Sequence, residues 1–190
     1  TLNDFLPKQD FVAGTLPYSV AIGDLDGDGR PDLAVANTTS NTVSIYLNTS
    51  TNGTIGSSSF AAKQDFTTRS KPTSVAIGDL DGDGKPDLAV ACNTGAPLSL
   101  NFISIFRNTS NTLGTISFAA KQDFAAANPS YVVISDLDGD GKPDLISVSS
   151  RSNSLSIFRN NSIRGSIDAS SFAAKQDFGT GVAPFSVAIG

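Results

Sequence analysis

A nine-residue acidic segment occurs three times along the chain and constrains its fold more than any other feature. It reads Asp-Leu-Asp-Gly-Asp-Gly-Lys-Pro-Asp at residues 79–87 and 136–144, and the copy at residues 24–32 differs only in having Arg30 in place of lysine. The copies begin 55 and 57 residues apart. Self-similarity at such a period is typical of repeat architectures, in which each repeat is one supersecondary unit.

Two further segments recur with the same period. An aromatic segment, Phe5–Phe11, returns at residues 60–66, 118–124 and 172–178, and the segment Tyr18–Gly23 returns almost unchanged as Phe185–Gly190. The 190 residues therefore hold three full periods and parts of two more.

The apolar residues within a period alternate with a step of two, which is typical of β-strands. Val20 and Ile22, then Leu33 and Val35, each alternate with small residues, and Val43–Leu47 and Phe60–Phe66 give two more strands. No segment of ten or more residues has helical spacing. Four strands per period match one blade of a β-propeller. A β-sandwich of short strands is the alternative, but it would not require a repeat.

The predicted fold class is therefore all-β: a β-propeller-type array of about three complete four-stranded blades plus partial blades at both ends. The expected units are a fourth strand of a preceding blade plus linker, three blades, and the first strand of a following blade. Their boundaries are residues 1–17, 18–66, 67–124, 125–178 and 179–190, in that order.

The composition removes many kinds of chemistry. The chain has no histidine, and all 18 acidic residues are aspartates. Histidine is the commonest general base and the usual base of nucleophilic triads. The single Cys92 excludes an internal disulfide and a cysteine-based zinc site. We therefore expect a protein that is not an enzyme.

Charge and hydropathy indicate which partners to exclude. The net charge of −5 disfavours nucleic-acid binding, which needs a basic surface. No stretch approaches the roughly 18 apolar residues that would span a bilayer, so no membrane insertion is expected.

Each acidic segment joins the first strand of its repeat to the second and has the ligand spacing of a metal loop. Aspartates stand at positions 1, 3, 5 and 9, and a backbone carbonyl at position 7 can complete the set. Four carboxylates so close together repel one another unless a cation lies among them. The glycine at position 6 allows the turn that returns the chain to the ion. The predicted ligands are Asp24, Asp26, Asp28, Arg30 and Asp32; Asp79, Asp81, Asp83, Lys85 and Asp87; and Asp136, Asp138, Asp140, Lys142 and Asp144, where Arg30, Lys85 and Lys142 act through their carbonyls.

The predicted cofactor is Ca²⁺, about three ions, one in each loop. Flexible, multidentate loops that offer only oxygen suit Ca²⁺ better than Mg²⁺, and the absence of nitrogen and sulfur ligands disfavours zinc and copper. An EF-hand is excluded because position 12 is Val35, Val90 or Ser147 rather than glutamate, and lies on a strand. Three solvated acidic turns without metal are the simplest alternative.

Residues 74–91, Ser-Val-Ala-Ile-Gly-Asp-Leu-Asp-Gly-Asp-Gly-Lys-Pro-Asp-Leu-Ala-Val-Ala, resemble the FG-GAP/VCBS repeat, the blade of integrin α-subunit propellers. Phe178-Gly179 followed by Gly181-Val182-Ala183-Pro184 is similar to the motif that gives the family its name, and the other repeats depart from it. The resemblance implies calcium loops on one rim of a propeller. It also implies an extracellular protein that serves adhesion, ligand binding or scaffolding.

The expected function is that of an extracellular, calcium-stabilised repeat module for binding, adhesion or structural assembly, a segment of a longer repeat protein or filament. A carbohydrate-binding lectin propeller is the alternative, and a non-catalytic part of a polysaccharide-active enzyme is the third. The expected partners are further repeats of the same chain or copies of itself, through open blade edges, and a protein or glycan ligand.

Five asparagines begin Asn-x-Ser/Thr glycosylation sequons: Asn37, Asn48, Asn52, Asn108 and Asn160. Three of them, Asn48, Asn108 and Asn160, occupy the same repeat position at the end of the third strand. Sequence alone leaves open whether this position carries glycans or only reflects the repeat.

Overall fold

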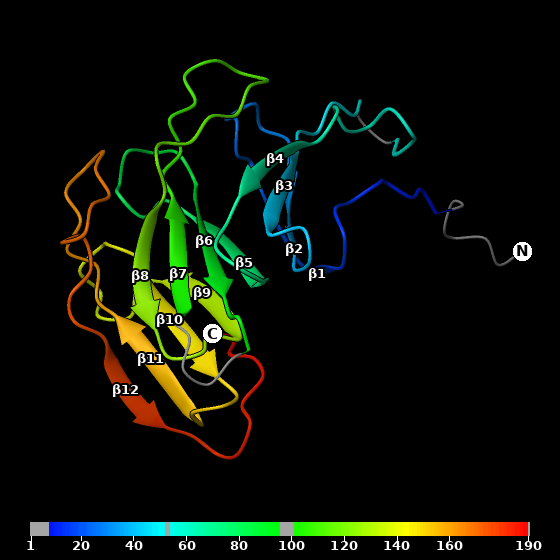
Figure 1. The fold of residues 1–190 in the computed structure, drawn as a ribbon. Helices are drawn as coiled ribbons and strands as arrows, with labels where there is room; N and C mark the ends of the chain where they lie inside the picture. The colour runs from blue at the N-terminus through cyan, green and yellow to red at the C-terminus, as the bar shows by residue number, and fades with distance from the viewer. Residues whose placement is uncertain (1–7, 52–53, 96–100, 190) are drawn as a thin grey trace, which may run out of the picture.

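The computed structural model describes residues 8–51, 54–95 and 101–189, and these residues form twelve β-strands (Figure 1). The first four are β1 (Pro17–Gly23), β2 (Asp32–Asn37), β3 (Thr42–Tyr46) and β4 (Gln64–Thr67). The next four are β5 (Pro72–Gly78), β6 (Asp87–Cys92), β7 (Asn101–Phe106) and β8 (Gln122–Ala126). The last four are β9 (Tyr131–Ser135), β10 (Asp144–Ser149), β11 (Ser154–Phe158) and β12 (Gln176–Gly179). No helix in the described part of the chain has the length and apolar character needed to cross a membrane.

The strands form three separate antiparallel sheets of four strands each, which confirms the all-β, blade-like prediction. We call them blade 1 (β1–β4), blade 2 (β5–β8) and blade 3 (β9–β12), and in each the strands are ordered as in the sequence. Across the described residues the three blades do not close into a ring. The predicted blade boundaries at residues 66/67, 124/125 and 178/179 stay a prediction.

The blades pack face to face through apolar residues. The first strands lie next to one another, β1 against β5 and β5 against β9. The small Ala34 and Ala36 of blade 1 share one buried cluster with Val75, Leu88 and Val90 of blade 2. Blade 2 presents Ala89 and Ala91 to blade 3 in the same way. Alternation of small and large residues on the two faces therefore lets neighbouring sheets approach closely.

Glycine is needed where the first strands meet. A Cβ atom added to Gly23 would lie 2.9 Å from Cγ2 of Ile77, and one added to Gly78 would lie 2.8 Å from Cγ2 of Ile134. Each isoleucine comes from the first strand of the next blade. A side chain at either glycine would therefore push two blades apart at the point where the acidic loop begins.

The fourth strand is shorter than the sequence predicted. Alternation predicts a strand over residues 60–66, but β4 begins at Gln64, and Phe60 forms only an isolated bridge to Asn48. From the Ile45–Gln64 pair to the Asn48–Phe60 pair, the fourth strand has one residue more than the third. This extra residue is a β-bulge, which interrupts a ladder without reversing the chain. Blades 2 and 3 repeat it.

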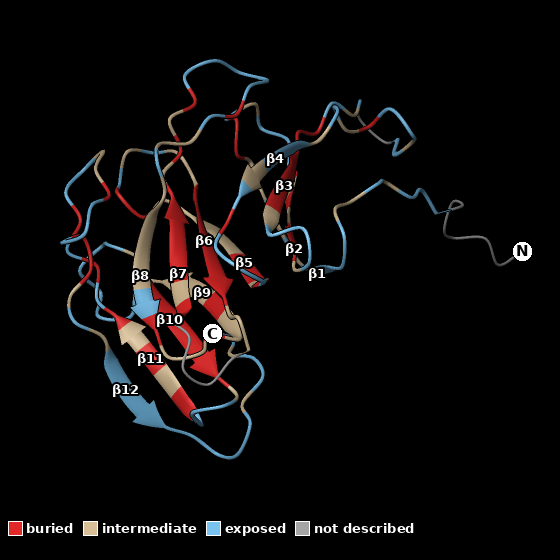
Figure 2. Cartoon of the chain, in the orientation of Figure 1, coloured by how far each residue is buried: buried red, intermediate tan, exposed pale blue. Residues whose placement is uncertain are grey.

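The outer strands differ from the inner ones in burial. β6 and β10 are buried along their whole length, whereas β12 is exposed (Figure 2). The fourth strand of each blade, β4, β8 or β12, carries or adjoins a lysine–aspartate ion pair: Lys63–Asp65, Lys121–Asp123 and Lys175–Asp177. Charged pairs on an edge strand oppose uncontrolled pairing with another sheet.

The two flanking segments contain no strand within the described residues. Residues 8–16 lie beside blade 1, and Phe11 packs edge-on against Phe60 with ring centroids 5.1 Å apart, as Phe66 packs against Phe118. Residues 185–190, within the predicted unit 179–190, were expected to form a first strand, but residues 185–189, which the structure describes, make no ladder. A strand assignment needs a hydrogen-bonded neighbour, and no described strand pairs with these residues.

Candidate metal centres

The three acidic segments form the loops between the first and second strands of the blades. We call them loop 1 (residues 24–32), loop 2 (residues 79–87) and loop 3 (residues 136–144). Both glycines of each loop have a positive φ, between 70° and 93°, in the left-handed region. Around Gly29, for example, there is open space for a side chain. Glycine is therefore required there by backbone conformation rather than by crowding.

The aspartate at position 1 organises the turn by accepting backbone N–H groups. Oδ1 of Asp24 accepts from Gly27 and Asp28 at 2.9 and 3.1 Å, and Oδ2 accepts from Gly29 at 2.8 Å. Asp79 and Asp136 accept from the corresponding amides of their own loops. The side chain of position 1 thus lies inside the turn that the glycines allow.

The aspartate at position 9 joins the loop to the end of the third strand. Oδ2 of Asp87 accepts from the Leu80 amide at 2.9 Å, and Oδ1 accepts from the Asn108 amide at 2.7 Å. Asp32 and Asp144 do the same with their own leucine and asparagine. All three carboxylates are at least 98% buried. Each of these carboxylates therefore links its loop to the sheet.

The structure brings together three of the four aspartates in each loop, those at positions 1, 3 and 9. In each group one carboxylate oxygen per residue lies within 4.8 Å of the other two. The groups are Asp24, Asp26 and Asp32; Asp79, Asp81 and Asp87; and Asp136, Asp138 and Asp144. Three carboxylates at this separation, with at least one of them buried, fit a hard divalent cation that prefers oxygen ligands. Each group can therefore hold a metal ion.

The aspartate at position 5 bonds the residue at position 7 and is not part of these groups of three carboxylates. Oδ1 of Asp28 accepts from the Arg30 amide at 2.9 Å, and its other oxygen pairs with the Arg30 guanidinium. Asp83 and Asp140 likewise accept from the position-7 amide. These three side chains, and the carbonyls of Arg30, Lys85 and Lys142, stay predicted ligands.

Sequence reasoning missed a basic residue beside two of the loops. At the end of the third strand, Arg107 lies 3.5 Å from both Asp81 and Asp83, and Arg159 bonds Asp138 and Asp140 at 2.5 and 2.9 Å. Blade 1 has Leu47 at this position, which immediately precedes the sequon asparagine. The residue before the sequon asparagine thus differs between the repeats. This difference is the sequence signal that could have indicated a basic residue beside loops 2 and 3.

Burial and neighbouring charges set the acidity of the loop carboxyls. Burial raises the pKa of Asp87 to about 7, opposed by the amides of Asn108 and Leu80 and reinforced by Asp81 and Asp83. Burial also raises the pKa of Asp32 and of Asp81. In loop 3, the hydrogen bond from Arg159 lowers the pKa of Asp138. The raised pKa values of these aspartates reflect the unfavourable energy of holding several carboxylates close together in a buried environment. A bound cation would offset this energy.

The sequon asparagines hold the loops in place. The buried Nδ2 of Asn108 donates to the carbonyls of Pro86 and Leu25, at 3.0 and 2.7 Å, and Asn160 donates to Pro143 and Leu80, at 2.7 Å each. Nδ2 of Asn48 donates to the Pro31 carbonyl, and that of Asn37 to residues of its own sheet. Since glycosylation attaches a bulky group to that nitrogen, a glycan at any of these four positions would disrupt the hydrogen bonds that the folded chain makes there. Asn52 lies outside the described residues.

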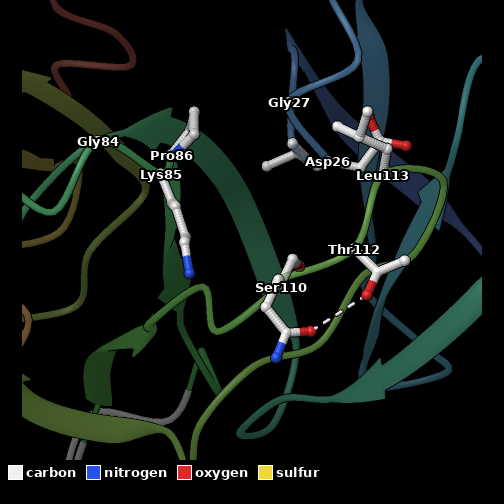
Figure 3. A pocket seen from close by; sticks show the side chains of 10 residues that line it. Asp26, Gly27, Gly84, Lys85, Pro86, Ser110, Thr112 and Leu113 are labelled. Carbon is white, nitrogen blue, oxygen red and sulfur yellow. Dashed lines mark hydrogen bonds between the residues drawn. The ribbon is translucent and has the colours of Figure 1, made fainter.

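A small cavity opens between blades 1 and 2 beside the loops (Figure 3). It measures about 240 Å³, and Leu25–Gly27 of loop 1, Gly84–Pro86 of loop 2 and residues 110–113 line it. The corresponding cavity between blades 2 and 3 measures about 310 Å³. Figure 3 shows Lys85 and Pro86 on one side of the cavity and Asp26 and Leu113 on the other. The space between neighbouring loops is thus a repeated feature of the molecule.

The described carboxylates outside the loops have structural partners. Asp65, Asp123 and Asp177 each accept from a buried serine of the neighbouring strand and from a lysine two residues earlier. Asp168 accepts from Ser170 and Ser171 within its own turn, and Asp10 pairs with Lys8. Burial raises the pKa of the Cys92 thiol to about 11, so little reactive thiolate forms.

A family model described as an FG-GAP-like repeat matches residues 24–90 and 136–190, which together are more than half of the chain. These segments include all three loops and most of blades 1 and 3. No curated protein sequence matches the chain.

Proposed function

The chain belongs to the FG-GAP-like repeat family, and on that premise we propose that it is an extracellular, calcium-stabilised module for binding, adhesion or assembly, without catalytic activity. The observation that carries the proposal is the gathering of three carboxylates in each of three equivalent loops. Repetition of the same donor set at the same place in every blade favours a shared structural ion over three unrelated acidic turns.

Calcium fits these loops better than other common cations. Every candidate donor is oxygen, and the loops are glycine-rich turns that can supply the six to eight ligands that Ca²⁺ takes. Mg²⁺ demands stricter octahedral geometry and keeps several of its waters. A bound Ca²⁺ would supply positive charge that neutralises the carboxylates at positions 1, 3 and 9.

An extracellular location is consistent with such sites. Modules outside cells use calcium sites with dissociation constants of about 10⁻⁴–10⁻³ M, which extracellular calcium still fills. Members of this family typically occur in extracellular proteins. The lone cysteine is buried, so exposure to an oxidising medium would leave it unpaired without harm.

The exposed face of blade 1 supports a role in assembly. Val20 is 58% exposed there, whereas its counterparts Val75 and Val132 are buried against the preceding blade at 6% and 1%. Ile22 is 67% exposed, whereas its counterparts Ile77 and Ile134 are partly buried. The surface that blades 2 and 3 bury on a neighbour is therefore open on blade 1. Further repeats or a second copy of the chain are the partners that this face fits best.

A lectin activity is the second candidate function, favoured by the two equivalent cavities between blades. Both are lined by a mixture of polar and apolar loop residues. Calcium-dependent binding on a glycan array would support this function, and a weaker signal in a Thr112→Trp variant, which changes an exposed residue of the first cavity, would place part of the binding there.

Calcium uptake tests the main proposal directly. Native mass spectrometry and calorimetry on chelator-treated protein should show three Ca²⁺ bound, and two in an Asp79→Asn/Asp81→Asn variant. Asp168→Asn, which changes an aspartate outside the loops, should still bind three. Protein that takes up no calcium at millimolar concentration would overturn the proposal.

Sedimentation tests the assembly role. In calcium, we expect concentration-dependent association that Ile22→Asp abolishes. Val182→Asp is the matched control, because Val182 is 90% exposed but follows the last strand of blade 3. Protein that remains monomeric at every concentration, with and without Ile22→Asp, would argue against self-association through this face.

A further inference from the structure

Asn108 connects two acidic loops through three hydrogen bonds. Its backbone amide donates to Oδ1 of Asp87 at 2.7 Å, and its Nδ2 donates to the Pro86 carbonyl at 3.0 Å, both in loop 2. The same Nδ2 donates to the Leu25 carbonyl of loop 1 at 2.7 Å. Leu25 lies between the candidate ligands Asp24 and Asp26, and its own amide donates to Asp32. One fully buried side chain therefore holds both loops.

Asn160 repeats this arrangement one blade further along. Its amide donates to Asp144, and its Nδ2 donates to Pro143 of loop 3 and to the Leu80 carbonyl of loop 2. The Leu80 amide in turn donates to Asp87, which accepts from Asn108. The result is a continuous series of hydrogen-bonded residues that connects the position-9 carboxylates of all three loops.

A second set of contacts joins the same loops. The Gly114 amide of blade 2 donates to Oδ2 of Asp26 in loop 1 at 3.0 Å. At the equivalent place in blade 3, the Gly165 amide donates to the Asp81 carbonyl of loop 2 at 3.1 Å. The position-3 residue of one loop is therefore also held by the following blade.

Asn48 provides the internal contrast. It makes the same bonds within its blade, from its amide to Asp32 and from its Nδ2 to Pro31. Among the described residues its side chain has no bond to another blade. The repeat position thus has one role inside its own loop, shared by all three asparagines, and a second role that only Asn108 and Asn160 show.

We propose that Asn108 and Asn160 are positioning residues that couple cation binding in adjacent loops, so that filling one loop raises the affinity of the next. The inference rests on the calcium binding put forward as the proposed function. A cation bound by Asp24 and Asp26 fixes the Leu25 carbonyl between them, and this carbonyl orients Asn108. Because the buried Nδ2 of Asn108 is shared between the Leu25 carbonyl of loop 1 and the Pro86 carbonyl of loop 2, the order extends to loop 2 and its ligand Asp87. Coupling of this kind changes affinity by about fivefold or more.

The test compares calcium affinity at one loop with its neighbour intact or disabled. In ¹⁵N-labelled protein, the Gly84 amide reports binding in loop 2 while calcium alone is titrated. Loop 1 is disabled by Asp24→Asn/Asp26→Asn, which removes charge but keeps an acceptor oxygen at each position. We expect this change to weaken calcium binding at loop 2 by about fivefold. In an Asn108→Ala background, the same change should weaken it by less than about twofold.

Asn48→Ala is the matched control. It removes the same side chain from the equivalent position and should weaken loop 1 alone, leaving the fivefold ratio at loop 2 intact. If Asn108→Ala does not fold, the Asn160→Ala variant gives the same test, with Asp79→Asn/Asp81→Asn as the disabled neighbour and Gly141 of loop 3 as the reporter.

The outcomes separate the two proposals. Calcium that binds all loops with affinities independent of their neighbours, or a coupling that survives both asparagine substitutions, would overturn this inference and leave the proposed function standing. Protein whose loops bind no calcium would overturn both.

Discussion

Loops 2 and 3 have the same nine-residue sequence but different surroundings. Leu80 of loop 2 is 1% exposed, whereas Leu137 of loop 3 is 44% exposed. Asp81 is buried, and its counterpart Asp138 is exposed. Burial raises the pKa of Asp81, while Arg159 lowers that of Asp138. Identical residues therefore form two electrostatically different sites.

The difference comes from the following blade. Asn160 and Ser162 of blade 3 donate to the Leu80 carbonyl of loop 2, and Gly165 donates to the Asp81 carbonyl. Within the described residues, no bond from another blade reaches loop 3. The properties of an acidic loop are thus set partly by the neighbour that covers it, and the loop sequence alone does not determine them.

Removal of the cation should have the largest effect and should act on the two loops unequally. With dissociation constants of about 10⁻⁴ M, three sites in about 10 mM calcium stabilise the fold by about 2.7 kcal/mol each. Together this is about 8 kcal/mol, so at about 2–4 °C per kcal/mol chelation should lower the melting temperature by at least about 16 °C. Calorimetry measures this shift, and hydrogen exchange should show the amides of Gly139 and Gly141 losing protection before those of Gly82 and Gly84. An unchanged melting curve would contradict the proposed calcium role.

Truncation of the two loop leucines should break the equivalence of the loops most directly. Leu80→Ala removes a fully buried side chain and should cost about 2–4 kcal/mol in the free energy of unfolding. Leu137→Ala, the same change at the same repeat position, should cost about 0.5 kcal/mol, because Leu137 is partly solvated. Urea unfolding in saturating calcium gives both values. Equal losses would mean that blade 3 does not cover loop 2 in solution.

The pH dependence of the cation-free protein should reveal the buried Asp87. Its folded pKa of about 7 lies above the ordinary value of 3.8, so between these values the folded state binds more protons than the unfolded state. Stability should therefore fall as pH rises from about 4 to about 7. The carboxyls of Asp65, Asp123 and Asp177 have lowered pKa values, and their contribution is already complete above about pH 5.

Melting curves in chelator between pH 5 and pH 8 measure this effect, and the absence of histidine keeps that window free of other side chains that ordinarily titrate there. We expect the melting temperature to decline by several degrees over this pH range, since each kcal/mol of lost stability lowers it by roughly 2–4 °C. The Asp87→Asn variant should show a much smaller decline. With calcium present the decline should vanish, because the ion binds the deprotonated carboxylates. A profile that is flat in the chelated protein would show that Asp87 is ionised throughout.

Much of the fold follows from the sequence because its signals are local and repeated. Alternation of Val20 and Ile22 with small residues is a property of a single strand, and the period predicts three copies of each sheet. The bulge before Gln64 could not be predicted, since it arises from how β4 must align with β3. Alternation continues through residues 60–66 and gives no sign of the extra residue.

The candidate site could also be predicted only in part. The spacing of the aspartates indicates a metal loop, and the structure groups those at positions 1, 3 and 9. The pairing of Asp28 with Arg30, and the contact of Arg159 with Asp138, depend on side chains that meet only after folding. The recurring Asn108 and Asn160 are visible in the sequence, but their sequons leave open whether glycans are attached and give no sign of the buried hydrogen bonds between loops that the structure contains.

The basic residues beside loops 2 and 3 should give the smallest effect and the finest contrast. Arg159 bonds the candidate ligand Asp138 at an exposed site, whereas Arg107 lies 3.5 Å from the buried Asp81. Replacing either by leucine, the residue that blade 1 has at this position, removes a positive charge and should tighten calcium binding at that loop by about threefold in low salt. In about 1 M KCl the gain at loop 3 should disappear, since exposed charges are screened, and part of the gain at loop 2 should remain.

Calcium titrations of Arg107→Leu and Arg159→Leu at two salt concentrations measure both gains. Lys8→Leu is the control, because Lys8 is exposed and remote from the loops in sequence. Equal salt sensitivity at the two loops would mean that blade 3 does not shield loop 2 from solvent ions.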